Sequence, residues 1–368
     1  MAKVGHHWLN LPQDILLEIF RYLTIEEKAN IRATCKYLQQ LIDHPTLWTN
    51  RTIVLKSLQS CNSLFWRTLR KRRIRSVVIK EATQKQWQGM VNLLPDLTAV
   101  TIDVKKNLER LRTLRSLKNL QKLQLNNKLQ MLDQELLREV AVFKQLTHLV
   151  LCTSVFIQNS SLCHLAELTK LLALTLHARQ KSPSLTSLQY VLFRLPKLRE
   201  LSLSSVDKCE NLSLCFTPPE MTTFKPTGTG PLAEYVKILP SDLTSLNLIN
   251  TRLSNVDVQL LSDSSGKTLK YLGLVLCGGI TEIMLKKLPK QFPFLQSLDL
   301  SGCNLLKPDI LFGFVELAFL KEIVISNNPH LTEAVIKQFR TLTDNRVHVA
   351  QKNKRNRNQC DCNFILCM

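Results

Sequence analysis

Apolar residues along most of the chain occupy the first, fourth and sixth positions of a short unit, with mainly polar or small residues between them. Regular copies begin at Leu97, Leu120, Leu146, Leu171, Leu198, Leu243, Leu269, Leu295 and Leu320. An irregular first copy begins at Ile74, and a last copy contains Val347 and Val349. Neighbouring regular copies start 23 to 27 residues apart, except for one step of 45. The alternation within each unit predicts a short strand whose leucines point into a core.

This period and pattern are typical of the leucine-rich repeat, whose unit is roughly 20 to 29 residues long. Each unit buries its leucines only against its neighbours, so the units are expected to stack into a curved solenoid. Residues 184–195 and 331–342 have helical spacing and should form part of the convex side. We therefore predict an α/β repeat solenoid over residues 74–350, with about ten repeats, strands on the concave side and helices on the convex side.

Residues 6–52 follow a different pattern. Pro12 suits a first helical turn, and apolar residues then occupy nearly the whole circumference of the helix that follows. A helix of this kind must be covered on all sides, and a module of three short helices buries too little surface to cover it. The module is therefore expected to keep apolar surface for a partner.

The same segment resembles the F-box family, which has an aromatic residue, a Leu-Pro pair, an apolar helix and a closing Leu-Trp. The matching residues are Trp8, Leu9, Leu11, Pro12, Ile15, Leu16, Ile19, Phe20, Leu23, Cys35, Leu41, Leu47 and Trp48. Leu38 and Thr34 depart from the family pattern, and both fall in the third helix. The segment from Cys277 to Thr281 also resembles the cysteine-containing repeats that are typical of F-box proteins.

The resemblance implies a substrate-recognition subunit of an SCF-type cullin–RING ubiquitin ligase. The F-box would bind a Skp-type adaptor, which joins it to the cullin and RING subunits, and the repeats would bind a target protein. The residues expected to contact the adaptor are Trp8, Leu11, Pro12, Ile15, Leu16, Ile19, Phe20 and Leu23. The protein would not itself be an enzyme and would need no cofactor. Two alternatives are an adaptor-bound scaffold without ligase function and a basic nuclear protein that contacts nucleic acid.

Target binding is expected on the outward positions of the strands. Ile249, Tyr271 and Val275 should form an apolar cluster across adjacent strands, and such a cluster can anchor a partner. The alternative is that another part of the chain covers this face. One candidate is residues 206–238, which lie within the 45-residue step and are rich in proline and glycine. A long loop of this kind is usually either functional or disordered.

The other candidate is the tail, residues 351–368, which combines a basic run with Cys360, Cys362 and Cys367. A disordered tail is the default interpretation. Palmitoylation of Cys360 or Cys362 beside the basic run is an alternative that would give the two signals needed for membrane anchoring. A metal site at these cysteines lacks a second pair of ligands.

The formal net charge of +20 is unevenly distributed. Residues 65–128 contain sixteen basic and four acidic side chains, a local net charge of +12. Within residues 53–73, interpreted as a basic helical linker, the cations become dense, and the run continues to Arg75. This run has three interpretations: a solvated junction helix, a nuclear-import signal, or a phosphate or nucleic-acid contact. The absence of interleaved aromatic residues argues against nucleic acid.

Fewer features of the sequence bear on the cellular location of the protein or on catalysis. The chain shows no secretory signal and no apolar stretch long enough to span a membrane, and its odd number of cysteines, 11, favours reduced thiols. These features predict a cytoplasmic or nuclear protein. The eight histidines are scattered, and no catalytic motif or glycine-rich phosphate loop is present.

Overall fold

The computed structural model describes residues 11–49, 51–58, 61–104, 108–127, 133–153, 159–178, 185–205, 239, 243–249 and 253–351. The chain divides into two compact units, the first made chiefly of residues 1–103 and 109–122 and the second chiefly of residues 123–366. The predicted loop at 206–238 and the tail beyond Gln351 lie outside the described residues.

The first unit begins with a small helical module. It contains α1 (Gln13–Arg21), α2 (Ile25–Arg32), α3 (Lys36–Ile42) and a 3-10 turn, η2 (Pro45–Leu47). The side chains of Thr24 and Glu27 form a reciprocal cap at the start of α2, which satisfies two backbone N–H groups that the helix itself leaves unpaired. Leu16, Ile42 and Trp48 are buried in the core of the module.

The first repeats follow directly in the same unit. Their elements are β1 (Thr52–Ser57), α4 (Ser63–Lys71), β2 (Ser76–Glu81), α5 (Gln84–Leu93), β3 (Ala99–Val104), α6 (Glu109–Thr113) and η3 (Leu114–Ser116). The strands are parallel, and Thr52 pairs with Ser76, which in turn pairs with Ala99. The prediction of a helical linker over residues 53–73 was therefore wrong for its first part, because a strand forms there and pairs with β2.

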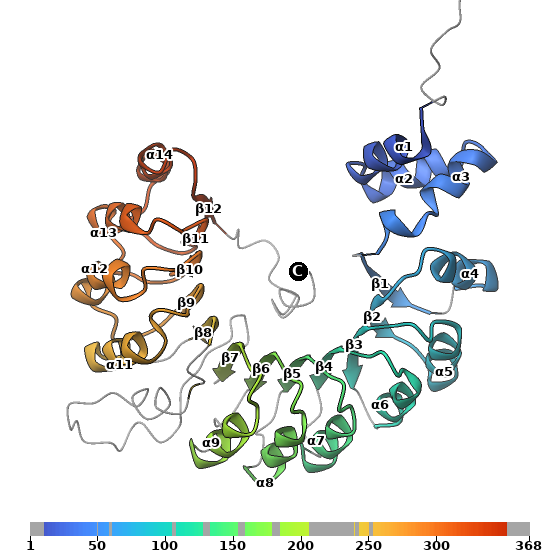
Figure 1. The fold of residues 1–368 in the computed structure, drawn as a ribbon, viewed down its shortest axis with the longest axis horizontal. Helices are drawn as coiled ribbons and strands as arrows, with labels where there is room; N and C mark the ends of the chain where they lie inside the picture. The colour runs from blue at the N-terminus through green and yellow to red at the C-terminus, as the bar shows by residue number, and fades with distance from the viewer. Residues whose placement is uncertain are drawn as a thin grey trace, which may run out of the picture. The chain divides into compact units, whose positions relative to one another are not determined.

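The second unit continues the alternation of strand and helix. Its elements are β4 (Lys122–Asn127), α7 (Asp133–Ala141), β5 (His148–Thr153), α8 (Asn159–Leu162), η4 (Cys163–Glu167), β6 (Ala173–Ala178), α9 (Leu185–Phe193), β7 (Glu200–Ser205), β8 (Ser245–Ile249), α11 (Asn255–Ser265), β9 (Tyr271–Val275), α12 (Glu282–Gln291), β10 (Ser297–Asp299), α13 (Pro308–Gly313), η5 (Phe314–Glu316), β11 (Glu322–Val324), α14 (Glu333–Leu342) and β12 (His348–Ala350). From β5 to β12 the strands pair in chain order and in parallel. Within this unit the strands lie on the inner side and the helices on the outer side (Figure 1). This is the predicted α/β repeat solenoid.

The strands β7 and β8, which flank the 45-residue step, are neighbours in the sheet. Glu200 on β7 pairs directly with Ser245 on β8, as neighbouring strands do elsewhere in the unit. The repeat therefore resumes in register after the inserted residues, as the interrupted leucine pattern predicted.

The repeated leucines form the core, and a ladder of polar side chains fixes their spacing. Leu146, Leu171 and Leu295, for example, have no exposed surface. At the end of successive strands, the Cys277 thiol donates to the carbonyl of the preceding repeat, and Cys303 and Asn328 do the same in the next two repeats. Each bond gives a buried polar side chain a backbone partner in the preceding repeat.

Gly266 lies where the end of α11 approaches α12. A Cβ atom there would come within 2.4 Å of the Ser262 carbonyl oxygen and 2.5 Å of the Gln291 carbonyl oxygen. Because both are backbone atoms, we expect Gly266→Ala to destabilise the second unit by about 2 kcal/mol. Gly313→Ala is the control, since beyond its chain neighbours and its own helix backbone no atom lies within 4 Å of its Cβ position. Denaturant unfolding measures both variants, and equal stability would contradict the packing described.

Candidate functional site

One face of α1 carries a stripe of exposed apolar side chains. Leu11, Ile15 and Ile19 are 38%, 49% and 46% exposed, and Tyr22 at the end of the stripe is 84% exposed. Residues three or four positions apart lie on the same side of a helix, so these four side chains form one continuous surface, called here the α1 apolar face. An apolar stripe that faces solvent is a typical protein-binding surface.

The opposite side of α1 packs the core of the module. Leu16 is fully buried, and Phe20 is 2% exposed. The structure thus divides the predicted adaptor contacts into two groups: Leu11, Ile15 and Ile19 offer free surface, whereas Leu16 and Phe20 support the helix from within. Contact with an adaptor stays a prediction for all of these residues.

Of the remaining predicted adaptor contacts, the structure describes Pro12 and Leu23 but not Trp8. Pro12 is exposed and precedes the first turn of α1, and Leu23 is partly exposed just after the helix. Trp8 lies outside the described residues. Two exposed side chains were not predicted, Tyr22 and Ile25, the latter 62% exposed. The helical spacing from Ile19 could have indicated Tyr22, since it lies three positions further along the same face.

Charged side chains border the α1 apolar face. Asp14 and Glu18 are exposed on the same helix, and Glu18 forms an ion pair of 2.7 Å with Arg21. An apolar centre with a charged rim is the usual anatomy of a protein–protein interface.

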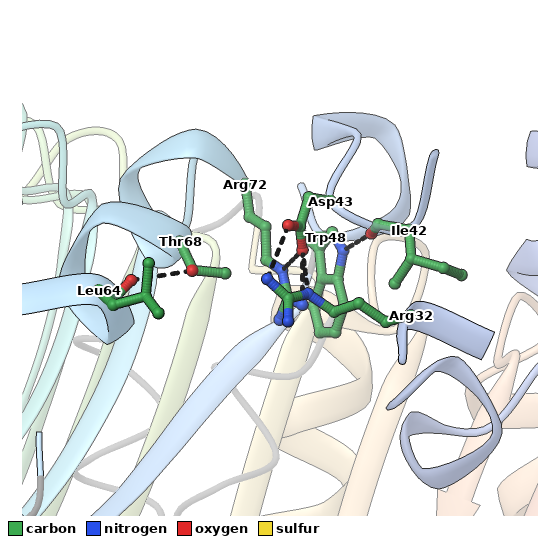
Figure 2. Close-up of polar contacts among 7 residues, drawn as sticks. All are labelled: Arg32, Ile42, Asp43, Trp48, Leu64, Thr68 and Arg72. Carbon is green, nitrogen blue, oxygen red and sulfur yellow. Dashed lines mark hydrogen bonds and ion pairs between the residues drawn. The ribbon is translucent and has the colours of Figure 1, made fainter. Parts of the chain in front are cut away.

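A buried ionic cluster joins the helical module to the first repeat (Figure 2). The Asp43 carboxylate, 3% exposed, accepts hydrogen bonds from Arg32 at 2.9 and 3.0 Å and from Arg72 at 2.8 Å. The Arg72 guanidinium also stacks on the Trp48 ring, 3.8 Å from its centroid. Asp43 and Trp48 belong to the helical module and Arg72 ends α4, so this cluster fixes α4 against the module.

Arg72 was expected to be one of several solvated cations in the basic run. Its side chain is only 13% exposed, because the guanidinium is held between a carboxylate and an aromatic ring. No local pattern indicated this arrangement, since the partners of Arg72 lie 24 and 29 positions away.

The pKa of the Asp43 carboxyl is lowered from its ordinary value of 3.8. Burial alone would raise this pKa, but the hydrogen bonds and charges of Arg32 and Arg72 outweigh burial. A carboxyl whose folded pKa is depressed contributes stability above its unfolded pKa, and this contribution is lost as the pH falls through the folded pKa.

We therefore expect Asp43→Asn to lower the free energy of unfolding at pH 7. Below about pH 4 the difference between wild type and variant should shrink, because Asp43 itself becomes neutral. Urea unfolding of both proteins between neutral and acidic pH measures this difference. A difference that stays constant over the range would contradict the role given to the carboxylate.

The predicted target-binding residues lie on neighbouring strands, but not all at the same level. Val275 pairs with Ile249 at the carboxyl ends of β9 and β8, whereas Tyr271 begins β9 and pairs with Ser245 and Ser297. The side chain of Ile249 lies outside the described parts.

The Tyr271 side chain lies along the strand face, and its role in target binding stays a prediction. The Tyr271 hydroxyl lies close to Gly273: a Cβ atom built at Gly273 would be 2.9 Å from the hydroxyl oxygen. Burial, together with the charges of Asp299 and Glu322, raises the pKa of Tyr271. The ring is therefore a neutral, partly buried part of the strand face.

On several strands the middle row of outward positions offers little surface. Gln124, Val150 and Thr175 are each at most 2% exposed, and Asp299 and Val324 are 5% exposed. These side chains stand between two flanking rows on strands that lie only about 4.8 Å apart, so their neighbours cover them. On these strands a partner must bind mainly through the flanking rows.

The described residues contain no group of three or more metal-binding side chains. No helix in those same residues is long and apolar enough to cross a membrane.

The chain combines an F-box-like domain with a leucine-rich-repeat fold. Residues 8–54 match the F-box-like family. No curated protein sequence matches the chain. Among solved structures, it is similar to a chain in the crystal structure of the Rad7 and Elc1 complex from yeast, with a TM-score of 0.51 and 13% identity over 89% of this chain and 87% of that chain.

Two further structures are similar over part of their length. One is the leucine-rich-repeat ectodomain of the Arabidopsis receptor kinase HAESA in complex with an extended IDA peptide hormone, with a TM-score of 0.36 and 14% identity over 76% of this chain and 41% of that chain. The other is the TLR13–ssRNA13 complex, with a TM-score of 0.30 and 16% identity over 76% of this chain and 51% of that chain. Both are too distant to bear on function.

Proposed function

We propose that this protein is the substrate-recognition subunit of an SCF-type cullin–RING ubiquitin ligase. The observation that carries the proposal is the exposed α1 apolar face within a segment that matches the F-box-like family. Similarity of the fold to a chain from the complex of Rad7 and Elc1 supports a role within an assembly.

In this role the protein acts by proximity. The F-box-like module binds a Skp-type adaptor, the adaptor joins it to the cullin and RING subunits, and the repeats hold the target. The RING subunit and the ubiquitin-conjugating enzyme carry out the chemistry. Holding the target nearby raises the effective concentration of its lysines at the charged enzyme, so the receptor itself needs no catalytic residue.

The Asp43 cluster suits this role because it ties the docking module firmly to the first repeat. A bidentate Arg–carboxylate pair with a second arginine and an aromatic ring leaves the junction few alternative arrangements. In such a receptor the orientation of the bound adaptor determines the orientation of α4, because no flexible linker separates the helical module from α4.

Target capture is assigned to the strand face around β8 and β9. We expect replacement of Ile249, Tyr271 and Val275 by charged residues to abolish target capture, because charges would be placed where an apolar contact is expected. Co-purification of the ubiquitin-modified target with each variant measures this effect. Unchanged capture would remove these residues from the target site.

The proposed function is tested by affinity purification from cells in which the proteasome is inhibited. The intact protein is compared with a Leu11→Ala/Pro12→Ala variant, which alters only exposed residues before α1. We expect the intact protein to bring down adaptor, cullin and ubiquitin-modified target, and the variant to lose adaptor and cullin while it retains the target. Adaptor without cullin would indicate a scaffold instead, and steeply salt-dependent binding of nucleic acid would indicate a basic nuclear protein that contacts nucleic acid.

A further inference from the structure

Five cations gather at the end of α4 and just beyond it. Arg67, Arg70, Lys71, Arg73 and Arg75 are all exposed, and they are called here the α4 basic surface. Arg67, Arg70 and Lys71 lie three and four positions apart, so they share one side of the helix. Arg72, in the middle of the run, turns inward to Asp43 and takes no part.

None of the five has an ion pair or side-chain hydrogen bond within the described chain. Some exposed cations elsewhere are paired: Lys286 with Asp309, Lys307 with Glu282 and Lys144 with Glu167. Like charges placed close together without counter-charges repel one another. The α4 basic surface is thus a concentration of positive charge that no acidic side chain of the described residues neutralises by an ion pair.

Arg73 occupies a position that favours glycine. Its φ of 51° is left-handed, and its N–H bonds the Arg70 carbonyl while the N–H of Ile74 bonds that of Leu69. This is the helix ending in which glycine is preferred, because a side chain is strained there. An arginine at this position costs stability, and the chain gains a fifth exposed cation from it.

An exposed apolar side chain adjoins these charges. Leu64 is 66% exposed, and its place three and seven positions before Arg67 and Lys71 puts it on the same side of α4. Figure 2 shows Leu64 and Thr68 on this helix, away from the Asp43 cluster. The surface therefore offers one apolar contact beside several cations.

We propose that the α4 basic surface binds an acidic protein segment that carries an apolar residue among its carboxylates or phosphates. Four of the five cations are arginines, whose planar guanidinium groups can pair bidentately with either anion. Leu64 supplies the apolar contact at one end. This site is distinct from the α1 apolar face and from the strand face, and binding to it does not depend on the adaptor.

A protein segment fits this surface better than nucleic acid does. Contact with single strands relies on aromatic side chains that stack on bases, and no aromatic residue belongs to the surface. A phosphate backbone would be held by the cations alone and would gain nothing from Leu64, whereas a mixed acidic and apolar peptide would use both.

The test measures binding of labelled probes to the full-length chain by fluorescence anisotropy. The probes are an oligoglutamate peptide, the same peptide with one central leucine, the same peptide with phosphoserines in place of glutamates, and a short DNA duplex. We expect the leucine-containing peptide to bind most tightly, with affinity that falls between about 50 and 200 mM salt. The phosphoserine peptide shows whether phosphate or carboxylate is the preferred anion.

Three variants and one control make the outcome specific. Arg70→Glu/Lys71→Glu should weaken binding of the leucine-containing peptide by about tenfold or more. Leu64→Ser should lower the affinity for the leucine-containing peptide to that for the plain oligoglutamate peptide, and leave the latter unchanged. Arg73→Gly should weaken binding without lowering Tm, which separates binding from folding. Lys290→Glu/Lys337→Glu, which makes the same change in net charge at exposed sites on other helices, should bind as wild type does. Equal binding by all variants, or tighter binding of the DNA duplex through the same cations, would overturn the proposal.

Discussion

The double substitution Ile15→Asp/Ile19→Asp is expected to lower the affinity for a Skp-type adaptor by about 100-fold or more. Both side chains are nearly half exposed at the centre of the α1 apolar face, so the unbound protein should fold normally. In the complex, however, two carboxylates would be buried against apolar surface without partners, and burial of an unpaired charge costs several kcal/mol. Titration of purified adaptor into each protein measures the change.

A matched control separates a docking effect from general loss of surface hydrophobicity. Val256→Asp/Ile283→Asp replaces two exposed aliphatic residues, 38% and 61% exposed, on α11 and α12. This control should bind the adaptor as wild type does. If the α1 variant keeps its affinity while both proteins are folded, the α1 apolar face is not the docking surface.

Replacement of Asp43 by alanine is expected to have the largest effect on stability. It leaves the guanidinium groups of Arg32 and Arg72 without their shared carboxylate, and removal of one partner from a buried ionic cluster typically costs about 3 to 5 kcal/mol. The lower end applies here because Arg32 is 29% exposed and can be partly solvated. Urea unfolding of the full-length protein measures the loss, which belongs to the first unit.

Asp96→Ala provides the comparison within the same unit, because Asp96 is exposed and has no ion pair in the described structure. Its stability should differ from that of wild type by less than about 0.5 kcal/mol. An equally small change for Asp43→Ala would show that the cluster does not hold α4 against the helical module.

The repeat was predictable because its physics is local and periodic. Leucines at fixed spacing predicted strands that pair in chain order, and Leu146, Leu171 and Leu295 are fully buried as expected. The strand β1 was missed because Thr52–Ser57 lacks the full repeat pattern and directly follows the helical module. Pairing with β2 stabilises this strand, and such tertiary pairing leaves no signal in the short segment itself.

Side-chain roles in the helical module were harder to predict. The residue pattern predicted that α1 is apolar on nearly all sides, but it could not tell which residues face the module's own core. Leu16 and Phe20 turned out to be buried, while Ile15 and Ile19 are exposed, because α3 and the η2 turn pack against only one side of α1. The Asp43 cluster escaped prediction for a related reason: its members are distant in sequence and meet only in the fold.

Amide hydrogen exchange of the full-length protein, with and without a purified Skp-type adaptor, tests the central claim most directly. If the α1 apolar face docks the adaptor, exchange across Gln13–Arg21 should slow markedly on addition of adaptor, while exchange in α11 and α12 should not change. A folded protein whose α1 exchanges at the same rate at saturating adaptor would contradict the assignment.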